Sequence, residues 1–338
     1  MSDRGAERVT DLVRGAWVTL GVRAACRLDL FDALDEPRTA DDLAARIGAD
    51  PRTLTRLLRV LAHLDLVAHE RGEWTPTELG ALLRGGHPSG MRDLVLMQTW
   101  LPSLAAWQNL DDAVRTGQSA YERVNGRTFW ADLAARPDLE HDFNGAMARR
   151  AAEQARALVA HADLDRVGSL VDVGGGRGGM VEALLRERPD LTAVVADRPD
   201  VATQATSYLA EAGFGTHAHG EPCDFFTSVP GGGDVYTISN VLHDWDDDDC
   251  VAILKTVRAA VRPDARLLVV EKVLGVRGRS LEADRDLALV DLHMLVMFGA
   301  RERTQEEYDA LVTAADFTPT RLLAAECEWN VLEARPAD

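Results

Sequence analysis

The sequence predicts an α/β protein, in which a Rossmann-like, doubly wound domain follows an N-terminal helical domain of winged-helix type. Three observations predict it. In the second half of the chain, short apolar runs alternate with helical segments, as parallel strands and crossover helices do. The first of these runs, residues 170–173, breaks into a glycine-rich turn at 174–179, the pattern of a first crossover that cradles a ligand. Residues 8–75 have the pattern of helices followed by a short hairpin.

Composition limits the class of protein. The 338 residues allow two domains, and 46% of them are apolar, as in ordinary globular proteins. The N-terminus has no apolar signal core and no apolar run approaches the ~20 residues of a membrane helix, so we expect a cytoplasmic protein without a membrane partner. The net charge of −18 argues against a nucleic-acid partner, because phosphate binding needs a basic surface. The four cysteines are far apart, which favours reduced thiols.

The first predicted domain, residues 1–100, begins with helical apolar spacing from residue 8 to residue 34. Thr39 is expected to cap a helix that ends at Gly48, Asp50 precedes a second helix, and a hairpin is expected at 67–75. Such a winged-helix pattern serves either DNA binding or dimerisation and lid formation. Dimerisation is favoured, because the few arginines of this region stand beside many acidic residues.

Residues 101–160 are predicted to form a helical connector that is rich in tryptophan. Aromatic side chains on helices are usually core, but these could equally form the wall of a pocket for a flat aromatic substrate. Phe143 and Met147 lie late in this connector, one helix before the glycine turn. We expect the connector to line a substrate pocket.

The second predicted domain, residues 161–338, places polar side chains where its strands end. Asp197 ends the second strand, 23 residues after Gly174, where an acid can accept both hydroxyls of a ribose. Ligands of open parallel sheets bind at the carboxyl ends of the strands, so Asp197, Asp224, Ser239 and Glu271 should face one ligand. His243 follows the fourth strand closely and should lie just beyond them.

Other interpretations stay open at this point. The acidic run at 246–249 fits the N-terminus of a helix that starts near Cys250, and a metal site there is the weaker alternative. The glycine pattern and Asp197 also allow a nicotinamide-dependent oxidoreductase, although the helical first half and the His-Asp-Trp segment do not suit one. A winged-helix regulator with a ligand-sensing domain is disfavoured by the negative charge.

Six stretches occur in order along the chain: LVDVGGGRGG, ADRPDV, CDFF, NVLHDWDDDDC, LLVVEKVL and DLHMLVMFGARERTQEEY. Together they resemble the S-adenosylmethionine-dependent small-molecule O-methyltransferases, the class of plant caffeate-type and bacterial aromatic-polyketide enzymes. The resemblance covers essentially the whole chain. It implies S-adenosyl-L-methionine as the cofactor, S-adenosyl-L-homocysteine as its product, and a homodimer.

The resemblance also implies a role for individual residues. His243 matches the general base, and Glu271 and Glu302 match the two acids beside it. The residues implied at the cofactor are Asp172, Gly174, Gly176, Asp197, Cys223, Asp224, Phe225, Ser239, Asn240 and Trp245. Those implied at the acceptor are Phe143, Met147, Asp291 and Met294. Cys223 departs from the glycine that is common at its position.

We therefore predict methyl transfer to a hydroxyl of an aromatic or polyketide-like natural product. Ionising a phenol of pKa ~10 at pH 7 costs roughly 4 kcal/mol, and a histidine that takes the proton typically contributes ~10²–10⁴-fold. The alternative is a relative that keeps the cofactor but hydroxylates or decarboxylates a polyketide.

Overall fold

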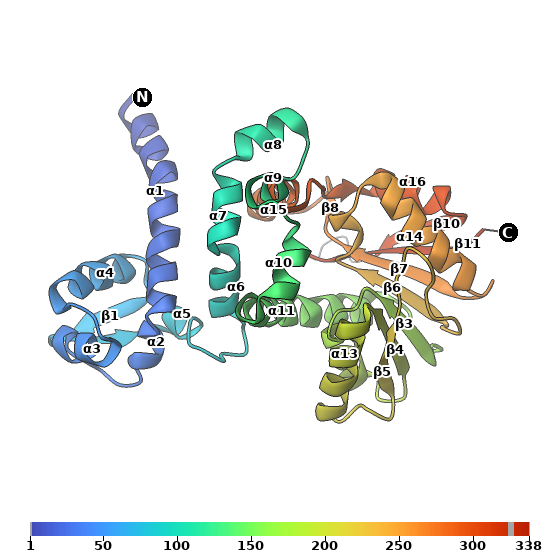
Figure 1. Ribbon diagram of the computed structural model, residues 1–338, viewed down its shortest axis with the longest axis horizontal. Coiled ribbons are helices and arrows are strands. Elements are labelled where there is room, and N and C mark those ends of the chain that lie inside the picture. The colour runs from blue at the N-terminus through green and yellow to red at the C-terminus, as the bar shows by residue number, and fades with distance from the viewer. Residues whose placement is uncertain (1, 324–327, 338) are drawn as a thin grey trace. The chain divides into compact units, whose positions relative to one another are not determined.

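The computed structural model describes residues 2–323 and 328–337, and the chain forms two compact units (Figure 1). The first unit comprises Met1–Leu104 and Trp130–Arg149, and the second comprises Ala105–Phe129 and Arg150–Asp338. The predicted connector contributes helices to both units, and the boundaries predicted at residues 100 and 160 stay predictions.

The first unit is helical with one hairpin. Its elements are α1 (Ser2–Arg27), α2 (Leu30–Ala33), α3 (Ala40–Ile47), α4 (Pro51–His63), β1 (Val67–Glu70), β2 (Glu73–Pro76), α5 (Glu78–Ala81) and α6 (Met91–Gln98). The helix expected over residues 8–34 is interrupted at Asp29, whose φ of 49° is left-handed and turns the chain between α1 and α2. Thr39 and Asp50 cap α3 and α4, because their side-chain oxygens accept from the amides of Asp42 and Thr53. The predicted helix–helix–hairpin pattern is thus confirmed.

The helix α1 carries a row of exposed apolar side chains. Val9, Leu12, Val13, Trp17 and Leu20 recur at helical spacing on it, and the exposed fraction is 67% for Leu12 and 69% for Trp17. A contiguous apolar surface of this kind marks an interaction site.

The second unit is built on a seven-stranded sheet in the order β10-β11-β7-β6-β3-β4-β5. The strands are β3 (Ser169–Val173), β4 (Thr192–Asp197), β5 (Ala218–Pro222), β6 (Val235–Ser239), β7 (Arg266–Glu271), β10 (Phe317–Leu323) and β11 (Asn330–Pro336). The five strands from β3 to β7 are parallel, whereas β10 and β11 are antiparallel to their neighbours. From β3, the chain adds β4 and β5 on one side and then returns to add β6 and β7 on the other side. The sheet is therefore doubly wound, as predicted.

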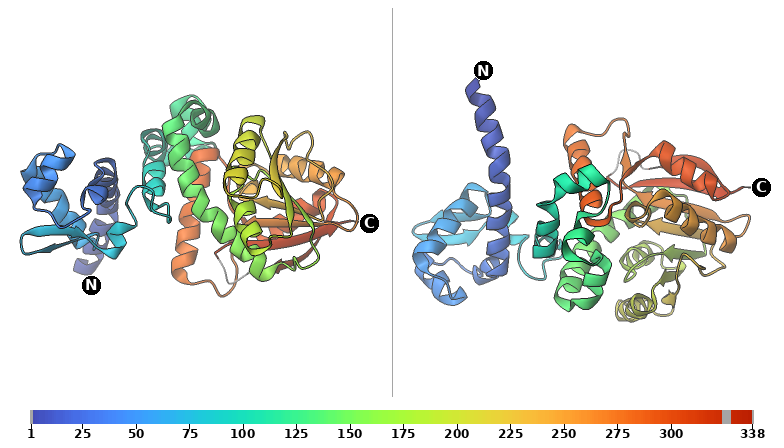
Figure 2. Two further views of the ribbon diagram at one scale, coloured as in Figure 1. Left: turned by 90° about the horizontal axis from the view of Figure 1, so that it is seen from below. Right: turned by 45° about the horizontal axis from the view of Figure 1, so that its top comes forward.

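Helices cover both faces of this sheet (Figure 2). One core joins the sheet to the end of α11 (Pro137–His161), to α12 (Gly179–Glu187) and to α13 (Pro199–Glu211). The other core joins it to α14 (Asp247–Ala260) and α16 (Gln305–Ala314). Successive residues of β7 alternate between the two cores, because side chains alternate along a strand. The remaining helices of the unit are α8 (Leu110–Thr116), α9 (Ala120–Asn125) and α15 (Leu281–Phe298), while α7 (Leu101–Trp107) and α10 (Phe129–Ala135) lie at the division between the units.

The five parallel strands lie within a few residues of their predicted positions, but α14 begins earlier than predicted. It starts at Asp247 rather than near Cys250, because Asp246 Oδ1 accepts from the amide of Asp249 at 2.9 Å and so caps the helix. The acidic run forms the cap and first turn, where carboxylates complement the helix dipole.

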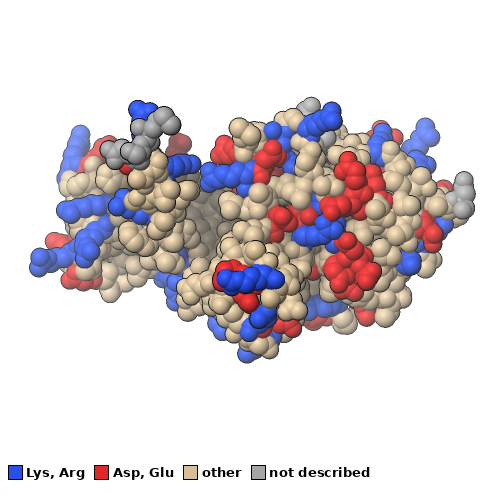
Figure 3. All heavy atoms as spheres, turned by 90° about the horizontal axis from the view of Figure 1, so that it is seen from above, with Lys and Arg blue, Asp and Glu red and all other residues tan. Residues whose placement is uncertain are grey.

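The charged side chains do not form a basic surface over the second unit on the face in Figure 3, where clusters of acidic side chains alternate with basic ones. Within the described residues, no helix is both long and apolar enough to cross a membrane. Cys26, Cys223 and Cys250 are free thiols, and Cys327 lies outside the described residues.

Candidate active site

The carboxyl ends of β3 and β6, where the sheet changes winding direction, carry the glycine turn and the His243 segment. Gly174 has a φ of +72°, and a Cβ added there would lie 2.7 Å from Val241 Cγ2. Only glycine fits this position, because both the backbone conformation and the close approach exclude a side chain. The turn therefore presents bare backbone to the space above the sheet edge.

Asp197, at the end of β4, is fixed against this turn. Its Oδ2 accepts from the Gly176 amide at 2.9 Å and its Oδ1 from the Arg198 amide at 2.7 Å. Burial raises the pKa of Asp197, and these two hydrogen bonds act in the opposite direction. Each carboxylate oxygen keeps a second lone pair, so Asp197 can still accept two hydroxyl protons.

Two buried polar atoms near the turn lack a hydrogen-bond partner among the described residues: Asp172 Oδ2 and Ser239 Oγ. The other carboxylate oxygen of Asp172 accepts from Thr237 at 2.8 Å. Burial raises the pKa of Asp172 to about 7, and the charge of Asp197 adds to the effect. Unpartnered buried atoms are rare in folded proteins, so these two indicate that a polar ligand completes the site.

An aromatic cluster stands beside the turn. The ring centroids of Phe226 and Trp245 are 4.8 Å apart, and Phe225 lies 5.2 Å from Phe226 and 6.0 Å from Trp245. The Cys223 amide donates to the Asp197 carbonyl at 2.8 Å, which ties the loop after β5 to the end of β4. Asp224 is exposed, and its Oδ1 accepts from the Phe226 amide. The aromatic rings can pack on the face of a purine, and the Asp224 carboxylate beside them can accept a hydrogen bond from its amino group.

His243 lies on a short 3-10 turn, η1 (Leu242–Asp244), directly after β6. Its Nδ1 lies 2.9 Å from Glu302 Oε1 and 3.9 Å from Glu271 Oε2, and its Nε2 lies 3.5 Å from Asp244 Oδ1. Burial disfavours the charged imidazole, but the three carboxylates together raise the pKa of His243 to about 10. The hydrogen bond to Glu302 orients the ring and leaves Nε2 for an exchangeable proton.

Glu271 acts mainly on the backbone of this turn. Its Oε1 accepts from the amides of Val241 and Leu242, both at 2.9 Å. Burial raises the pKa of Glu271 to about 7. The two acids that the sequence places beside the imidazole therefore differ, because only Glu302 hydrogen-bonds to it.

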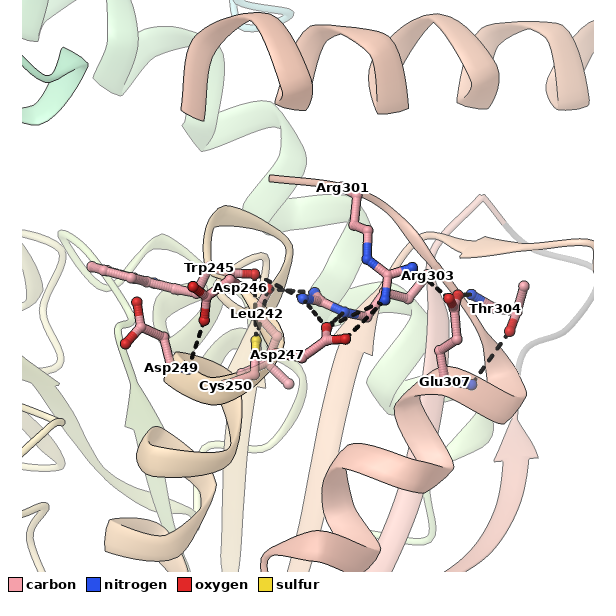
Figure 4. A network of polar contacts seen from close by, with 10 residues as sticks. All are labelled: Leu242, Trp245, Asp246, Asp247, Asp249, Cys250, Arg301, Arg303, Thr304 and Glu307. Atoms are coloured by element: carbon pink, nitrogen blue, oxygen red, sulfur yellow. Dashed lines mark hydrogen bonds and ion pairs between the residues drawn. The ribbon is translucent and has the colours of Figure 1, made fainter. Parts of the chain in front are cut away.

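Arg303 binds the carbonyl oxygens of the same segment (Figure 4). This fully buried side chain donates to the carbonyls of Leu242 and Trp245, each at 2.7 Å, and to Asp247 Oδ1 at 2.8 Å. Arg301 binds the same carboxylate at 3.0 Å and also Glu307. The amide of Thr304 donates to Glu307, whose own amide donates to the Thr304 hydroxyl in a capping box of α16.

Two family models match this chain: an O-methyltransferase dimerisation domain over residues 10–85 and an O-methyltransferase domain over residues 107–318. The chain belongs to the O-methyltransferase family.

The similar proteins span the chain. The phenazine O-methyltransferase PhzM of Lysobacter antibioticus is 36% identical over 96% of this chain and 94% of its own length. Among solved structures, the mitomycin 7-O-methyltransferase MmcR is 34% identical and superposes with a TM-score of 0.90 over 99% of this chain and 98% of its own. NcsB1, an O-methyltransferase from neocarzinostatin biosynthesis in complex with S-adenosylmethionine and 2-hydroxy-5-methyl naphthoic acid, is 31% identical with a TM-score of 0.78 over 94% of this chain and 95% of its own. The cofactor of this methyltransferase is S-adenosylmethionine. The alternative interpretation as a nicotinamide-dependent oxidoreductase is therefore rejected.

Relatives with other reactions have similar identity. The 8-amino-8-demethylriboflavin N,N-dimethyltransferase of Streptomyces davaonensis is 35% identical over 92% of this chain and 90% of its own length. The aclacinomycin 10-hydroxylase RdmB of Streptomyces purpurascens is 34% identical over 88% of this chain and 80% of its own. Family membership alone therefore does not choose the reacting atom of the acceptor.

The residues present fit the cofactor. The bare glycine turn, the orphaned oxygens of Asp172 and Ser239, and the two-oxygen acceptor Asp197 suit the polar amino-acid and ribose parts. The aromatic cluster and Asp224 suit a purine. Asn240 takes a left-handed φ of 56° at the end of β6, and its amide donates to the Val270 carbonyl at 3.0 Å.

The predicted acceptor residues are divided between the units. Asp291 and Met294 lie on α15 in the second unit, where Asp291 Oδ1 accepts from the Glu302 amide at 2.8 Å and Met294 is buried. Phe143 and Met147 lie on the part of α11 that belongs to the first unit, and Phe143 packs edge-on against Trp130 at 5.8 Å. Their contact with the acceptor stays a prediction.

Arg303 and Asp247 were not predicted as partners of the His243 turn. Arg303 stands among the charged residues Arg301, Glu302, Glu306 and Glu307, so no pattern in the sequence indicates that its side chain is buried. Which carbonyls it binds depends on contacts about 60 residues apart in the chain.

Proposed function

We propose that this enzyme transfers the methyl group of S-adenosylmethionine to a hydroxyl of an aromatic natural product, with His243 as the proton acceptor. The observation that carries the proposal is the buried His243–Glu302 pair at the sheet edge, beside the cofactor-binding residues. The acceptors named for its relatives, a phenazine and a naphthoic acid among them, are aromatic ring systems.

The residues account for the acid–base part of the reaction. The cofactor supplies an electrophilic methyl group, and the acceptor oxygen forms the new bond as the sulfur–methyl bond breaks. His243 Nε2 takes the hydroxyl proton while Nδ1 remains bound to Glu302. Glu302 stabilises the imidazolium that results, and Glu271 and Arg303 keep the turn from moving during the transfer.

Other residues hold the cofactor in this proposal. The backbone at Gly174 and Gly176 would hold its methionine and ribose parts, and Asp197 would accept hydrogen bonds from the ribose hydroxyls. Phe225 and Trp245 would hold the adenine, and Asp224 would accept a hydrogen bond from its amino group. Asp172, Cys223, Ser239 and Asn240 complete the pocket wall.

The proposed assembly is a homodimer, because residues 10–85 match a dimerisation domain and α1 exposes an apolar face. The cytoplasmic location stays a prediction.

Substitution of the imidazole tests the proposal. His243→Ala should bind S-adenosylhomocysteine within a few-fold of the wild type, because the ring lies beyond the cofactor residues, but should lose roughly 10²–10⁴-fold in kcat. Calorimetry measures the first quantity, and the rate of methylated product, followed by mass, measures the second. Near-normal turnover of this variant would reject His243 as the proton acceptor.

The hydroxylation alternative has support from the relative RdmB, an aclacinomycin 10-hydroxylase, whereas decarboxylation rests on the sequence resemblance. Product mass separates the reactions, because methylation adds a methyl group, hydroxylation adds an oxygen and decarboxylation removes carbon dioxide. An oxygenated or decarboxylated product without methylation would replace the proposed function.

A further inference from the structure

A second histidine lies near His243 within the second unit. His293 is on α15, which packs against η1 and whose Asp291 accepts the Glu302 amide. Trp107, the last residue of α7, stacks on His293 with ring centroids 5.9 Å apart and planes inclined by 19°. His293 is half-buried, and the charge of His243 acts on its ring, so the ring lies near the His243 turn.

Trp107 fixes the position of the proton on His293. The indole Nε1 lies 3.1 Å from His293 Nδ1, and an indole nitrogen is only a donor. Nδ1 of His293 must therefore be the acceptor, so the neutral ring carries its proton on Nε2.

The surroundings keep this ring neutral. Burial, together with the charges of Arg150 and His243, lowers the pKa of His293 to about 4. The charge of Arg150 also acts on Asp244, so this guanidinium lies near both the His293 ring and the His243 turn. At pH 7 the surroundings of the His243 turn thus include a fixed N–H donor and a cation.

Nε2 of His293 has no hydrogen-bond partner among residues 2–323 and 328–337. We propose that this Nε2–H donates a hydrogen bond to an unprotonated oxygen of the aromatic acceptor, a carboxylate or a ring carbonyl, and so selects acceptors that carry such an oxygen besides the methylated hydroxyl. The inference rests on the proposed function, and it makes His293 a specificity-determining residue. An acceptor with a carboxylate should bind more tightly than one with a ring carbonyl, because hydrogen bonds to a charged group are stronger and the positive charge of Arg150 attracts the carboxylate.

Binding to the complex with S-adenosylhomocysteine tests the inference without turnover. The probes are a set of hydroxynaphthoic acids with the carboxylate at different ring positions, each paired with the naphthol that lacks it. Calorimetry on the full chain should show that the wild type binds at least one acid more tightly than its parent naphthol. His293→Phe should weaken the binding of that acid roughly 10- to 100-fold and the binding of the naphthol by less than about threefold, because the variant keeps an aromatic ring and loses the N–H donor.

Three controls make the result decisive. His293→Gln retains an N–H donor and should keep most of the preference, whereas Trp107→Phe frees the proton to move to Nδ1 and should reduce it. If His293→Phe fails to bind S-adenosylhomocysteine, His293→Leu and the Gln variant replace it. The inference is overturned if the wild type shows no preference, if His293→Phe weakens the binding of both probes equally, or if His293→Gln binds them as His293→Phe does.

Methyl transfer to the same probes is measured separately. Absence of methylated product from every probe, with the binding pattern intact, would count against the proposed function rather than against the donor role of His293.

Discussion

His243 shows how neighbouring charges set the chemistry of one side chain. Burial alone would keep its imidazole neutral, but three carboxylates raise its pKa to about 10. That value is close to the ~10 of a phenol, so a proton moves between phenol and imidazole at little cost. An unperturbed histidine of pKa ~6.5 would make the same transfer unfavourable by roughly 5 kcal/mol. The acidic neighbours therefore match the base to its substrate.

This matching predicts the pH dependence of the reaction. At pH 7 the imidazole of the free enzyme is protonated and an ordinary phenol is neutral, so the productive pair forms with the release of one proton. For 1-naphthol as acceptor, kcat/KM should rise about tenfold per pH unit above pH 7 and level off near pH 10. Initial rates of methylated product across this range measure it. A profile that levels off near pH 6.5 would show that the carboxylates do not raise the pKa of His243.

Asp172 should make the stability of the protein without cofactor depend on pH. Its pKa is about 7 in the folded chain and 3.8 in the unfolded one, so the folded state binds the proton more tightly. Its contribution to stability therefore falls as pH rises from about 4 to about 7, by about 4 kcal/mol at most. Asp172→Asn, which keeps an acceptor for Thr237, should gain roughly 3 kcal/mol of this relative to the wild type between pH 5 and pH 8 in urea unfolding, because the rest of the change falls below pH 5.

Asp234→Asn is the matched control for this experiment. Although burial opposes ionisation of Asp234, hydrogen bonds from Gly168 and Ser169 lower the pKa of its carboxyl. Its contribution is lost only in more acid solution, so the Asp234 variant should show no relative gain between pH 5 and pH 8. An equal gain in both variants would mean that the effect comes from net charge and not from the buried site of Asp172.

Among the elements, the turn η1 depends on two other segments for its shape. A turn of three residues has little stability of its own. Glu271, at the end of β7, satisfies its amides, and Arg303, just before α16, satisfies the carbonyls of Leu242 and Trp245. The catalytic histidine is thus positioned by a buried carboxylate on one side and a buried guanidinium on the other.

Arg303→Lys should separate positioning from charge. Lysine keeps the cation but cannot bind both carbonyls and Asp247 as the planar fork does. We expect kcat to fall roughly 10- to 100-fold while affinity for S-adenosylhomocysteine stays within a few-fold. Arg301→Lys is the control, because Arg301 binds Asp247 and Glu307 but no carbonyl of the turn, and it should keep nearly full activity. If Arg303→Lys lowers only the melting temperature, the arginine supports the fold and does not position His243.

The elements that the sequence predicts well are those set by local interactions. Thr39, Gly48 and Asp50 mark helix ends through contacts within four residues, and the glycine turn and its strand follow one another directly. The interruption of α1 at Asp29 and the early start of α14 were missed, because a left-handed residue and a cap alter the backbone without altering the apolar spacing.

The candidate site could be predicted only in part for the same reason. The positions of Asp197 and His243 follow from strand order, since strand ends meet at one edge of a parallel sheet. Two features depend on tertiary contacts between residues that are tens to hundreds of positions apart in the chain. One is that Glu302 binds the imidazole whereas Glu271 binds backbone amides, and the other is the contact of Trp107 with His293. Apolar spacing contains no information about those pairings.

For the whole molecule, the exposed face of α1 should determine the oligomeric state. The side chains of Leu12 and Trp17 are about two-thirds exposed in the single chain, and burying apolar surface of this kind is worth roughly 25 cal/mol per Å². Trp17→Glu places a charge on this face and should convert a dimer into a monomer, as measured by light scattering during size-exclusion chromatography. Leu281→Glu is the control, because Leu281 is 90% exposed but lies outside the matched dimerisation region, residues 10–85. A Trp17 variant that remains dimeric at micromolar concentration would place the interface on a different surface.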